Sequence, residues 1–147
     1  MNPNAYYEIP VNKYIFNLAE KPEEKVRQWA IYELLSNFGV NINSIEIEVP
    51  VRVGTRTHRA DIVVYDNSVP YIVIECKRRE DKSHKKSLDQ AISYASSKEL
   101  NAKYAVATNG SYWKCARKIN DEWVTISEIK NFRENDEKFL SIIEVEA

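Results

Sequence analysis

The chain has 147 residues, of which 44% are hydrophobic and 29% are charged, and its formal net charge is −1. This composition is typical of a globular protein of one domain, and the near-zero charge excludes an overall electrostatic attraction to nucleic acid. Cys76 and Cys115 form no CxxC motif, so we expect neither a zinc site nor a disulfide framework. There is no signal-peptide pattern, and no apolar run approaches the ~20 residues of a membrane helix. We therefore expect a cytoplasmic protein without membrane contact.

The first part of the chain predicts a short strand over 11–17 and a helix over 21–39. Pro22 suits the first turn of that helix, where acidic side chains complement the helix dipole. Gly39 ends the pattern as a C-cap. The helix is expected to bury a stripe of apolar residues spaced four apart: Val26, Ala30, Leu34 and Phe38.

A strand and a β-hairpin follow. Strict alternation over 44–53 predicts a half-buried strand, in which Pro50 indicates a sheet edge or a bulge. The hairpin pairs residues 58–65 with residues 71–77. The apolar residues of the first strand are expected on one face: Ile45, Ile47, Val49, Val51 and Val53.

The second half of the chain predicts a helix, three strands and a final helix. Ser87 is expected to cap the first of these helices, which ends by Lys98. Asn109-Gly110 is a tight-turn signal, and the final helix starts near Ser127. The three strands are expected over 104–108, 112–118 and 122–126. Helices on both sides of one mixed sheet give an α/β domain.

The hairpin carries charged residues at the end far from its turn. A turn centred on Ser68 makes these residues face each other in pairs: Tyr65 and Tyr71, Val63 and Val73, Asp61 and Glu75. Lys77 follows Glu75 by two residues, so Asp61, Glu75 and Lys77 share one face. The other face is expected to enter the core with Ile62, Val64, Ile72, Ile74 and Cys76.

Two carboxylates about 5 Å apart repel each other unless a cation lies between them. Oxygen ligands of this kind suit Mg²⁺, which takes one or two carboxylates together with phosphate oxygens of a substrate, and the backbone carbonyls of Ile74 and Cys76 could add to them. Such a metal can activate water for in-line attack on phosphorus, and Lys77 could orient that water or neutralise the developing charge. The structural alternative is a pair of surface ion pairs, Glu75 with Lys77 and Asp61 with Arg59.

These residues resemble a known family. D61-x13-E75-C-K77 resembles the signature of PD-(D/E)xK nucleases, and more closely the N-terminal nuclease domain of type I restriction enzyme R subunits. Four further segments agree with that family: PEEKVRQWAIYELL, IEIEVPVRVG, Q90-A-I-S-Y94 and KYAVATNGSYWK. The resemblance covers about residues 20–118, which leaves 1–20 and 119–147 as peripheral extensions of a single nuclease-like domain over 1–147. It implies a restriction-endonuclease-like α/β fold whose central mixed sheet has helices on both faces.

The resemblance also implies roles for individual residues. Asp61 and Glu75 would be metal ligands and Lys77 the catalytic lysine of a metal-dependent DNA endonuclease. A glutamate of the first helix often completes such sites; Glu24 is the best match, and Glu23 and Glu33 are the alternatives. Gln90 and Tyr94 form a Gln-x3-Tyr motif, one helical turn apart, so both could reach the site or the DNA backbone. The residue before the aspartate is Ala60 where the signature has proline.

A basic segment follows Lys77. It could contact phosphates, or it could be a solvated loop. Its candidate DNA-binding residues are Arg78, Arg79, Lys82, Lys85 and Lys86. Further positive charge on the neighbouring strands comes from Arg52, Arg56 and Arg59.

Three functions remain open from the sequence. The first is a DNA endonuclease of a restriction-modification system that uses Mg²⁺, or Mn²⁺. The chain contains no GxxxxGK[ST] motif, so this enzyme would act alone or with a motor or specificity subunit in trans. The second is a DNA- or protein-binding module that keeps the fold without cleaving. The third is an assembly protein, for which a homodimer is one arrangement.

Overall fold

The structure is a computed structural model that describes residues 22–126. The strand predicted over 11–17 and the helix predicted from Ser127 lie outside the described residues. Within residues 22–126, six strands form one mixed sheet in the order of the sequence, and only β3 and β4 are parallel neighbours. They are β1 (Ile45–Val53), β2 (Arg56–Asp66), β3 (Val69–Cys76), β4 (Tyr104–Thr108), β5 (Trp113–Ile119) and β6 (Glu122–Ile126).

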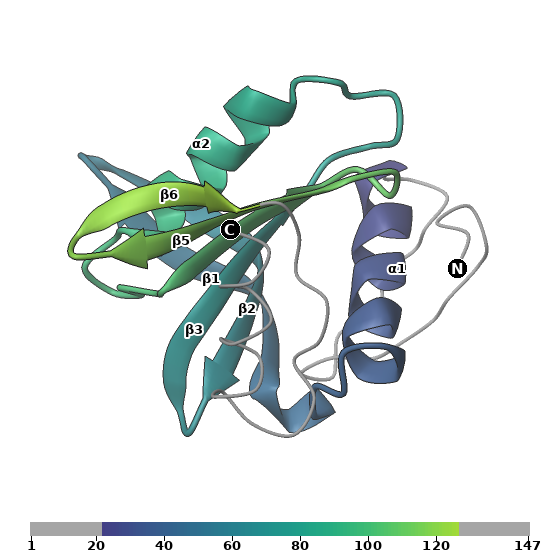
Figure 1. Cartoon of the computed structure of the whole chain (residues 1–147), viewed down its shortest axis with the longest axis horizontal. Helices are drawn as coiled ribbons and strands as arrows, with labels where there is room; N and C mark the ends of the chain where they lie inside the picture. The colour runs from purple at the N-terminus through teal and green to yellow at the C-terminus, as the bar shows by residue number, and fades with distance from the viewer. Residues whose placement is uncertain (1–21, 127–147) are drawn as a thin grey trace.

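The two described helices cover opposite faces of this sheet (Figure 1). Helix α1 (Pro22–Ser36) packs on one face and leads through a short 3-10 turn, η1 (Ile42–Ser44), into β1. Helix α2 (His84–Ala95) packs on the other face and forms the crossover between the parallel strands β3 and β4. The predicted restriction-endonuclease-like α/β architecture is therefore confirmed: a mixed sheet between two helices.

Helix α1 follows its sequence pattern. All four residues of the predicted stripe are buried: Val26, Ala30, Leu34 and Phe38. Gly39 has φ +71°, the left-handed conformation that glycine adopts most easily, and the Val40 amide donates to the Leu34 carbonyl at 2.9 Å. The predicted C-cap is thus present, and the chain turns directly toward η1.

Helix α2 begins one turn earlier than predicted. Its N-cap is Ser83, whereas Ser87, the predicted cap, is inside the helix and 2% exposed. The Asp81 carboxylate accepts the Ser83 amide at 2.8 Å, and the Ser83 carbonyl accepts the Ser87 amide at 2.9 Å. The turn closed by the Asp81 side chain therefore starts the helix before Leu88, the first apolar residue of the pattern.

Strand β1 corrects a second expectation, because its apolar residues do not share one face. Ile45 and Ile47 pack in the core beside α1, whereas Val51 packs in the core beside α2. The change occurs at Glu48, a non-glycine residue with φ +53°. Pairing of β1 with β2 stops after Ile47 and resumes at Val49, so the strand bends at this point. Pro50 lies on a sheet edge, as predicted, since β1 is the first strand of the order.

The hairpin register is correct in the middle of the strands and wrong near the turn. Val63 faces Val73 as predicted, but Tyr65 faces Pro70 because the register shifts after Val64. The turn residues are Asn67 and Ser68, both with positive φ, which is the geometry of tight hairpin turns. All five side chains predicted to enter the core lie in the core beside α1: Ile62, Val64, Ile72, Ile74 and Cys76.

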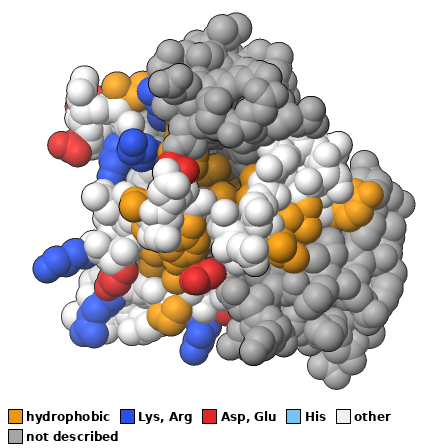
Figure 2. Space-filling view, turned by 90° about the horizontal axis from the view of Figure 1, so that it is seen from below, with side chains coloured by type: hydrophobic (Ala, Val, Ile, Leu, Met, Phe, Trp, Pro, Cys, Tyr) orange, Lys and Arg blue, Asp and Glu red, His pale blue; other side chains and the backbone are white. Residues whose placement is uncertain are grey.

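Few large apolar side chains of the described residues are highly exposed. Figure 2 shows hydrophobic side chains gathered near the centre of one face, with Lys and Arg side chains along one side of it. The large hydrophobic residues that are at least 40% exposed come from separate segments: Ile42, Val69, Ile119 and Val124. Single exposed apolar residues are ordinary, so we look for a site among the polar clusters.

Candidate active site

Asp61 and Glu75 hold the open end of the β2–β3 hairpin together through their side chains. The Asp61 amide donates to Glu75 Oε2 at 2.9 Å, and the Cys76 amide donates to Asp61 Oδ2 at 2.8 Å. Each carboxylate thus bonds to the backbone of the opposite strand, just beyond the last regular pair, Ile62 with Ile74. The two carboxyl groups are brought to one place, as the register counting predicted for their positions.

Both carboxyl groups have a pKa above the ordinary value of their residue type. Burial raises the pKa of Asp61 to about 6, against the opposing effects of the Cys76 amide and the Arg27 charge. Burial, and then the charge of Asp61, raise the pKa of Glu75 well above its ordinary value. Glu75 is 3% exposed and the Asp61 side chain 26%. Such a pair disfavours two negative charges and would be stabilised by a cation.

Lys77 is linked to the middle and the last turn of α2. Its Nζ donates to Gln90 Oε1 at 2.6 Å, and Gln90 Nε2 donates to the Tyr94 hydroxyl at 2.8 Å. The Lys77 amide donates to the Thr108 carbonyl at 2.9 Å, which extends the pairing of β3 with β4 by one bond. The four-residue spacing of Gln90 and Tyr94 therefore joins both side chains to the ammonium group of Lys77 in one chain of hydrogen bonds.

These residues line one open cleft of about 400 Å³. Its wall contains the sequence-predicted Asp61, Glu75, Lys77, Gln90 and Tyr94, and also Glu23, Arg59, Cys76, Arg78 and Asp81. The cleft therefore combines four carboxylates, one ammonium group and two guanidinium groups with the polar side chains of Gln90 and Tyr94. Within residues 22–126, no group of three or more His, Cys, Asp or Glu side chains is arranged to hold a metal ion.

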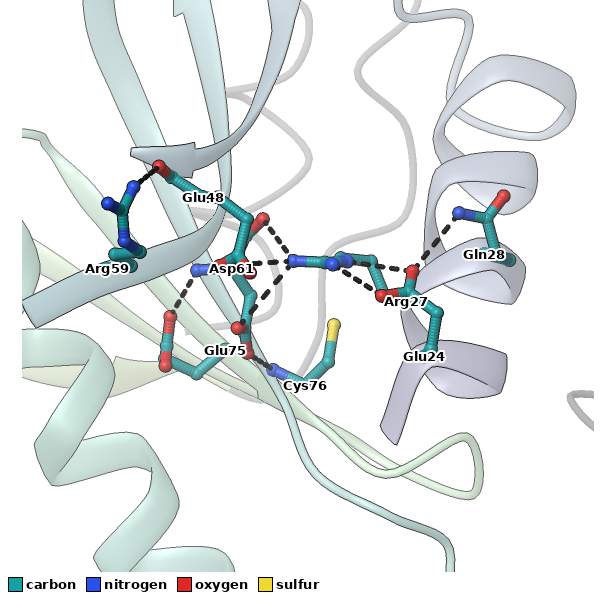
Figure 3. Close-up of polar contacts among 8 residues, drawn as sticks. All are labelled: Glu24, Arg27, Gln28, Glu48, Arg59, Asp61, Glu75 and Cys76. Carbon is teal, nitrogen blue, oxygen red and sulfur yellow. Dashed lines mark hydrogen bonds and ion pairs between the residues drawn. The ribbon is translucent and has the colours of Figure 1, made fainter. Parts of the chain in front are cut away.

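The glutamates predicted on the first helix are separated by the structure. Glu24 is 2% exposed and forms a two-pronged ion pair with Arg27, whose Nε lies 2.9 Å from Glu24 Oε2. The Arg27 guanidinium lies between Glu24 and Asp61 (Figure 3). Glu23 is exposed and lines the cleft with Asp61, while Glu33 bonds Asn37 at 2.6 Å and does not line the cleft. The structure thus brings Glu23 to the cleft, and Glu24 to a smaller pocket of about 110 Å³ that shares Glu23, Asp61 and Cys76 with the cleft.

The sequence reasoning missed Arg27 and Glu48. Arg27 Nη1 lies 3.5 Å from Glu48 Oε2 and 4.0 Å from Asp61 Oδ1. Burial alone would lower the pKa of Arg27, but the hydrogen bonds and charge of Glu24, with the charges of Asp61 and Glu48, raise it above its ordinary value. A sequence signal existed, because Arg27 shares the apolar face of α1 with Ala30 and Leu34. Glu48 gave none, since the alternation placed it on the solvent face.

The predicted basic residues lie beside the cleft, on the loop between β3 and α2 and on the first turn of α2. All five are exposed: Arg78, Arg79, Lys82, Lys85 and Lys86. Asn109 holds this loop, because its Nδ2 donates to the carbonyls of Arg79 at 3.0 Å and Asp81 at 2.8 Å. Its Oδ1 also accepts the Ser111 amide at 2.8 Å, so Asn109 serves both its predicted turn and the basic loop.

The fold and the cleft define an α/β domain of restriction-endonuclease-like architecture with an aspartate, a glutamate and a lysine at one end of its hairpin. Residues 22–132 match the family described as type I restriction enzyme R protein N terminus, and the chain belongs to this family. No curated protein and no solved structure matches the chain. Neither described helix is long and apolar enough to cross a membrane.

Proposed function

We propose that the chain is a metal-dependent deoxyribonuclease that hydrolyses phosphodiester bonds within DNA. The observation that carries this proposal is the convergence of Asp61, Glu75 and Lys77 in one open cleft. Membership in a family of restriction enzyme R proteins supports the choice of DNA as substrate and a role in restriction-modification.

The carboxylates of the cleft fit a hard divalent cation, Mg²⁺ or Mn²⁺. Each uses one oxygen for a backbone amide, Asp61 Oδ2 and Glu75 Oε2. A cation would be bound by Glu75 Oε1 and by Asp61 Oδ1, which also lies 4.0 Å from Arg27 Nη1. Mg²⁺ commonly takes one or two carboxylates and completes its shell with water and phosphate oxygens. Bound there, it would supply an activated water and stabilise charge at phosphorus. Glu23 is the helix-one glutamate that lines the cleft. The ligand role of Glu24 stays a prediction, since Glu24 lines the adjoining pocket with Asp61 while it pairs with Arg27.

Lys77, Gln90 and Tyr94 would act on the substrate side of the cleft. Gln90 holds the Lys77 ammonium through a 2.6 Å hydrogen bond, which fixes its direction before substrate arrives. A fixed ammonium group can neutralise negative charge that develops on the scissile phosphate or orient the attacking water. Tyr94, hydrogen-bonded to Gln90, is 5% exposed and limits the movement of both groups.

The basic loop and the start of α2 would hold the DNA backbone. The first turn of α2 has no acidic residue and carries Lys85 and Lys86, at the helix end that favours anions. Arg78 extends this surface into the cleft.

The salt dependence of DNA binding tests this surface. If Lys86 neutralises one phosphate, Lys86→Ala should lower the slope of the logarithm of the DNA-binding constant against the logarithm of the salt concentration by about 1. Lys98→Ala, an exposed change beyond the C-terminal end of α2, is the matched control and should leave the slope unchanged.

Cleavage assays test the proposal directly. Supercoiled, linear and single-stranded DNA are incubated with the protein and Mg²⁺ or Mn²⁺. We expect Glu75→Ala and Lys77→Ala to abolish cleavage, a loss of at least about 100-fold, while circular dichroism shows an unchanged fold. Lys25→Ala, an exposed change on α1, should cleave like the unaltered protein. Absence of cleavage of every DNA form by the unaltered protein, alone and with a type I motor subunit added, would count against an enzyme.

One observation favours a non-cleaving DNA- or protein-binding module as the second candidate. Asp61 and Glu75 each already bond a backbone amide, so the end of the hairpin is held together without a metal. Calorimetric titration with Mn²⁺ separates the two functions. A nuclease should bind Mn²⁺ alone or with DNA present, whereas a module that has kept only the fold should bind none.

Whether the chain works as a homodimer or with a subunit in trans stays a prediction. Sedimentation with and without DNA would test it.

A further inference from the structure

A buried arginine lies directly behind the candidate metal site. Arg27 is 5% exposed, and its guanidinium contacts three separate segments of the chain. On α1 it forms the two-pronged ion pair with Glu24. On β1 its Nη1 lies 3.5 Å from Glu48 Oε2, and on β2 it lies 3.5 Å from the Asp61 carbonyl and 4.0 Å from Asp61 Oδ1 (Figure 3).

The backbone on both sides is shaped to reach this arginine. Glu48 has φ +53°, an unfavourable conformation for a non-glycine residue that persists only when its surroundings enforce it. At this residue the ladder between β1 and β2 lacks a pair, at the position opposite Asp61. The missing pair leaves the Asp61 carbonyl free to accept from Arg27, and the bend brings the Glu48 carboxylate to the guanidinium. The helix and two strands therefore meet at one charged group.

Glu24 holds that group in place. Both of its oxygens bond Arg27, and Oε2 also accepts Gln28 Nε2 at 3.2 Å. Its side chain is 2% exposed and lines a small pocket together with Arg27 and Asp61, so Glu24 is placed to orient the arginine beside Asp61. A guanidinium held by a two-pronged pair has a fixed direction, which a lysine ammonium in its place would not have.

We infer that Arg27 is a positioning residue of the metal site: held by Glu24 and Glu48, it fixes the backbone and carboxylate of Asp61 so that Asp61 can bind a cation together with Glu75. The inference rests on the proposed function, because it assigns the cation to the Asp61–Glu75 pair. Residues that orient metal ligands through hydrogen bonds typically change metal affinity by about tenfold to hundredfold when they are replaced.

The test is Mn²⁺ binding by isothermal titration calorimetry without DNA, with the melting temperature measured on the same samples. Removing Arg27 alone would leave Glu24 buried without its partner, so the main variant is Glu24→Met combined with Arg27→Met, which removes both charges. Arg27→Lys keeps the charge but loses the two-pronged geometry. Glu24→Gln keeps an acceptor for Arg27 but removes the carboxylate. Lys25→Met, an exposed change on the same helix, is the matched control.

We expect the double variant and Arg27→Lys to melt near the unaltered protein but to bind Mn²⁺ about tenfold to hundredfold more weakly. Glu24→Gln keeps only one prong of the pair with Arg27 and should bind Mn²⁺ more weakly than the unaltered protein but more tightly than Asp61→Asn. Lys25→Met should bind Mn²⁺ like the unaltered protein. Unchanged affinity in the double variant would overturn the inference and leave the proposed function intact. A loss in Glu24→Gln as large as that in Asp61→Asn would also overturn it, because Glu24 would then be a ligand. If the unaltered protein binds no Mn²⁺ with or without DNA, the proposed function fails and the inference fails with it.

Discussion

The two ends of the β2–β3 hairpin hold their strands together in different ways. Toward the turn, Ile62, Val63 and Val64 pair regularly with β3, and their side chains are buried on both faces of the sheet. At the open end, backbone pairing between the two strands stops, and the carboxylates of Asp61 and Glu75 accept the amides of the opposite strand instead.

This contrast shows that an interruption in backbone pairing fixes polar side chains in place. Regular pairing uses every backbone group and leaves side chains only the task of packing. Where pairing ends, at Asp61 of β2 and Glu48 of β1, polar side chains must satisfy the exposed backbone groups and are then held at fixed positions. We therefore expect changes at the apolar end to lower the free energy of unfolding. Changes at the charged end should alter metal binding and catalysis, and should leave the free energy of unfolding nearly unchanged or raise it.

The largest expected effect on the free energy of unfolding comes from a change in the apolar end of the hairpin. Ile62 is 0% exposed, and Ile62→Ala should lower the free energy of unfolding by about 2–5 kcal/mol through lost burial and a residual cavity. Urea denaturation measures this. Val69→Ala, in the same hairpin at a residue 60% exposed, is the matched control and should change stability by about 0.5 kcal/mol or less. An equal effect of the two changes would contradict the division of the hairpin.

Much of the apolar end could be predicted from the sequence, because alternation of large apolar residues fixes which side chains face which core. The prediction failed where a backbone conformation intervened. Tyr65 faces Pro70 because the two-residue turn at Asn67 and Ser68 is followed by a register shift. The two faces of β1 were not foreseen because a left-handed glutamate at position 48 leaves no trace in a hydrophobic pattern.

The charged end was predictable where it depends on local spacing. Counting across the turn brought Asp61 opposite Glu75, and a four-residue helical spacing brought Gln90 beside Tyr94. The partner of Glu24 was not predictable, because it depends on how α1 is rotated on the sheet, and that rotation is set by tertiary packing. A buried arginine on an apolar helix face is the signal that would have indicated it.

The stability of the charged end should depend on pH through Asp61 and Glu75. Burial raises the pKa of Asp61 to about 6 and that of Glu75 well above its usual value, whereas both ionise near pH 4 in an unfolded chain. Above about pH 4 the folded protein therefore holds more protons at these groups than the unfolded chain, so their contribution to the free energy of unfolding falls as pH rises, through about pH 6 for Asp61 and higher for Glu75.

Mg²⁺ binds the ionised carboxylates and should oppose this loss, so it should raise the melting temperature more at pH 7.5 than at pH 5, two values chosen to lie about 1–2 units on either side of the Asp61 pKa. Differential scanning calorimetry at both pH values, with and without Mg²⁺, measures the difference. A metal effect that is equal at both would mean that Asp61 and Glu75 are not where the cation binds.

The smallest expected effect on stability comes from Glu75→Gln. This change separates the hydrogen bond that Glu75 accepts from the Asp61 amide from the negative charge that binds a cation. A glutamine in its place can still accept the Asp61 amide at Oε1, but it has no charge to bury. Glu75→Gln should raise the melting temperature of the metal-free protein at neutral pH by about 3 °C, which corresponds to roughly 1 kcal/mol, and should abolish Mn²⁺ binding. Glu99→Gln, an exposed change beyond α2, should alter neither. A lower melting temperature in Glu75→Gln would show that the buried carboxylate contributes to the fold, and the charged end of the hairpin would then be structural as well.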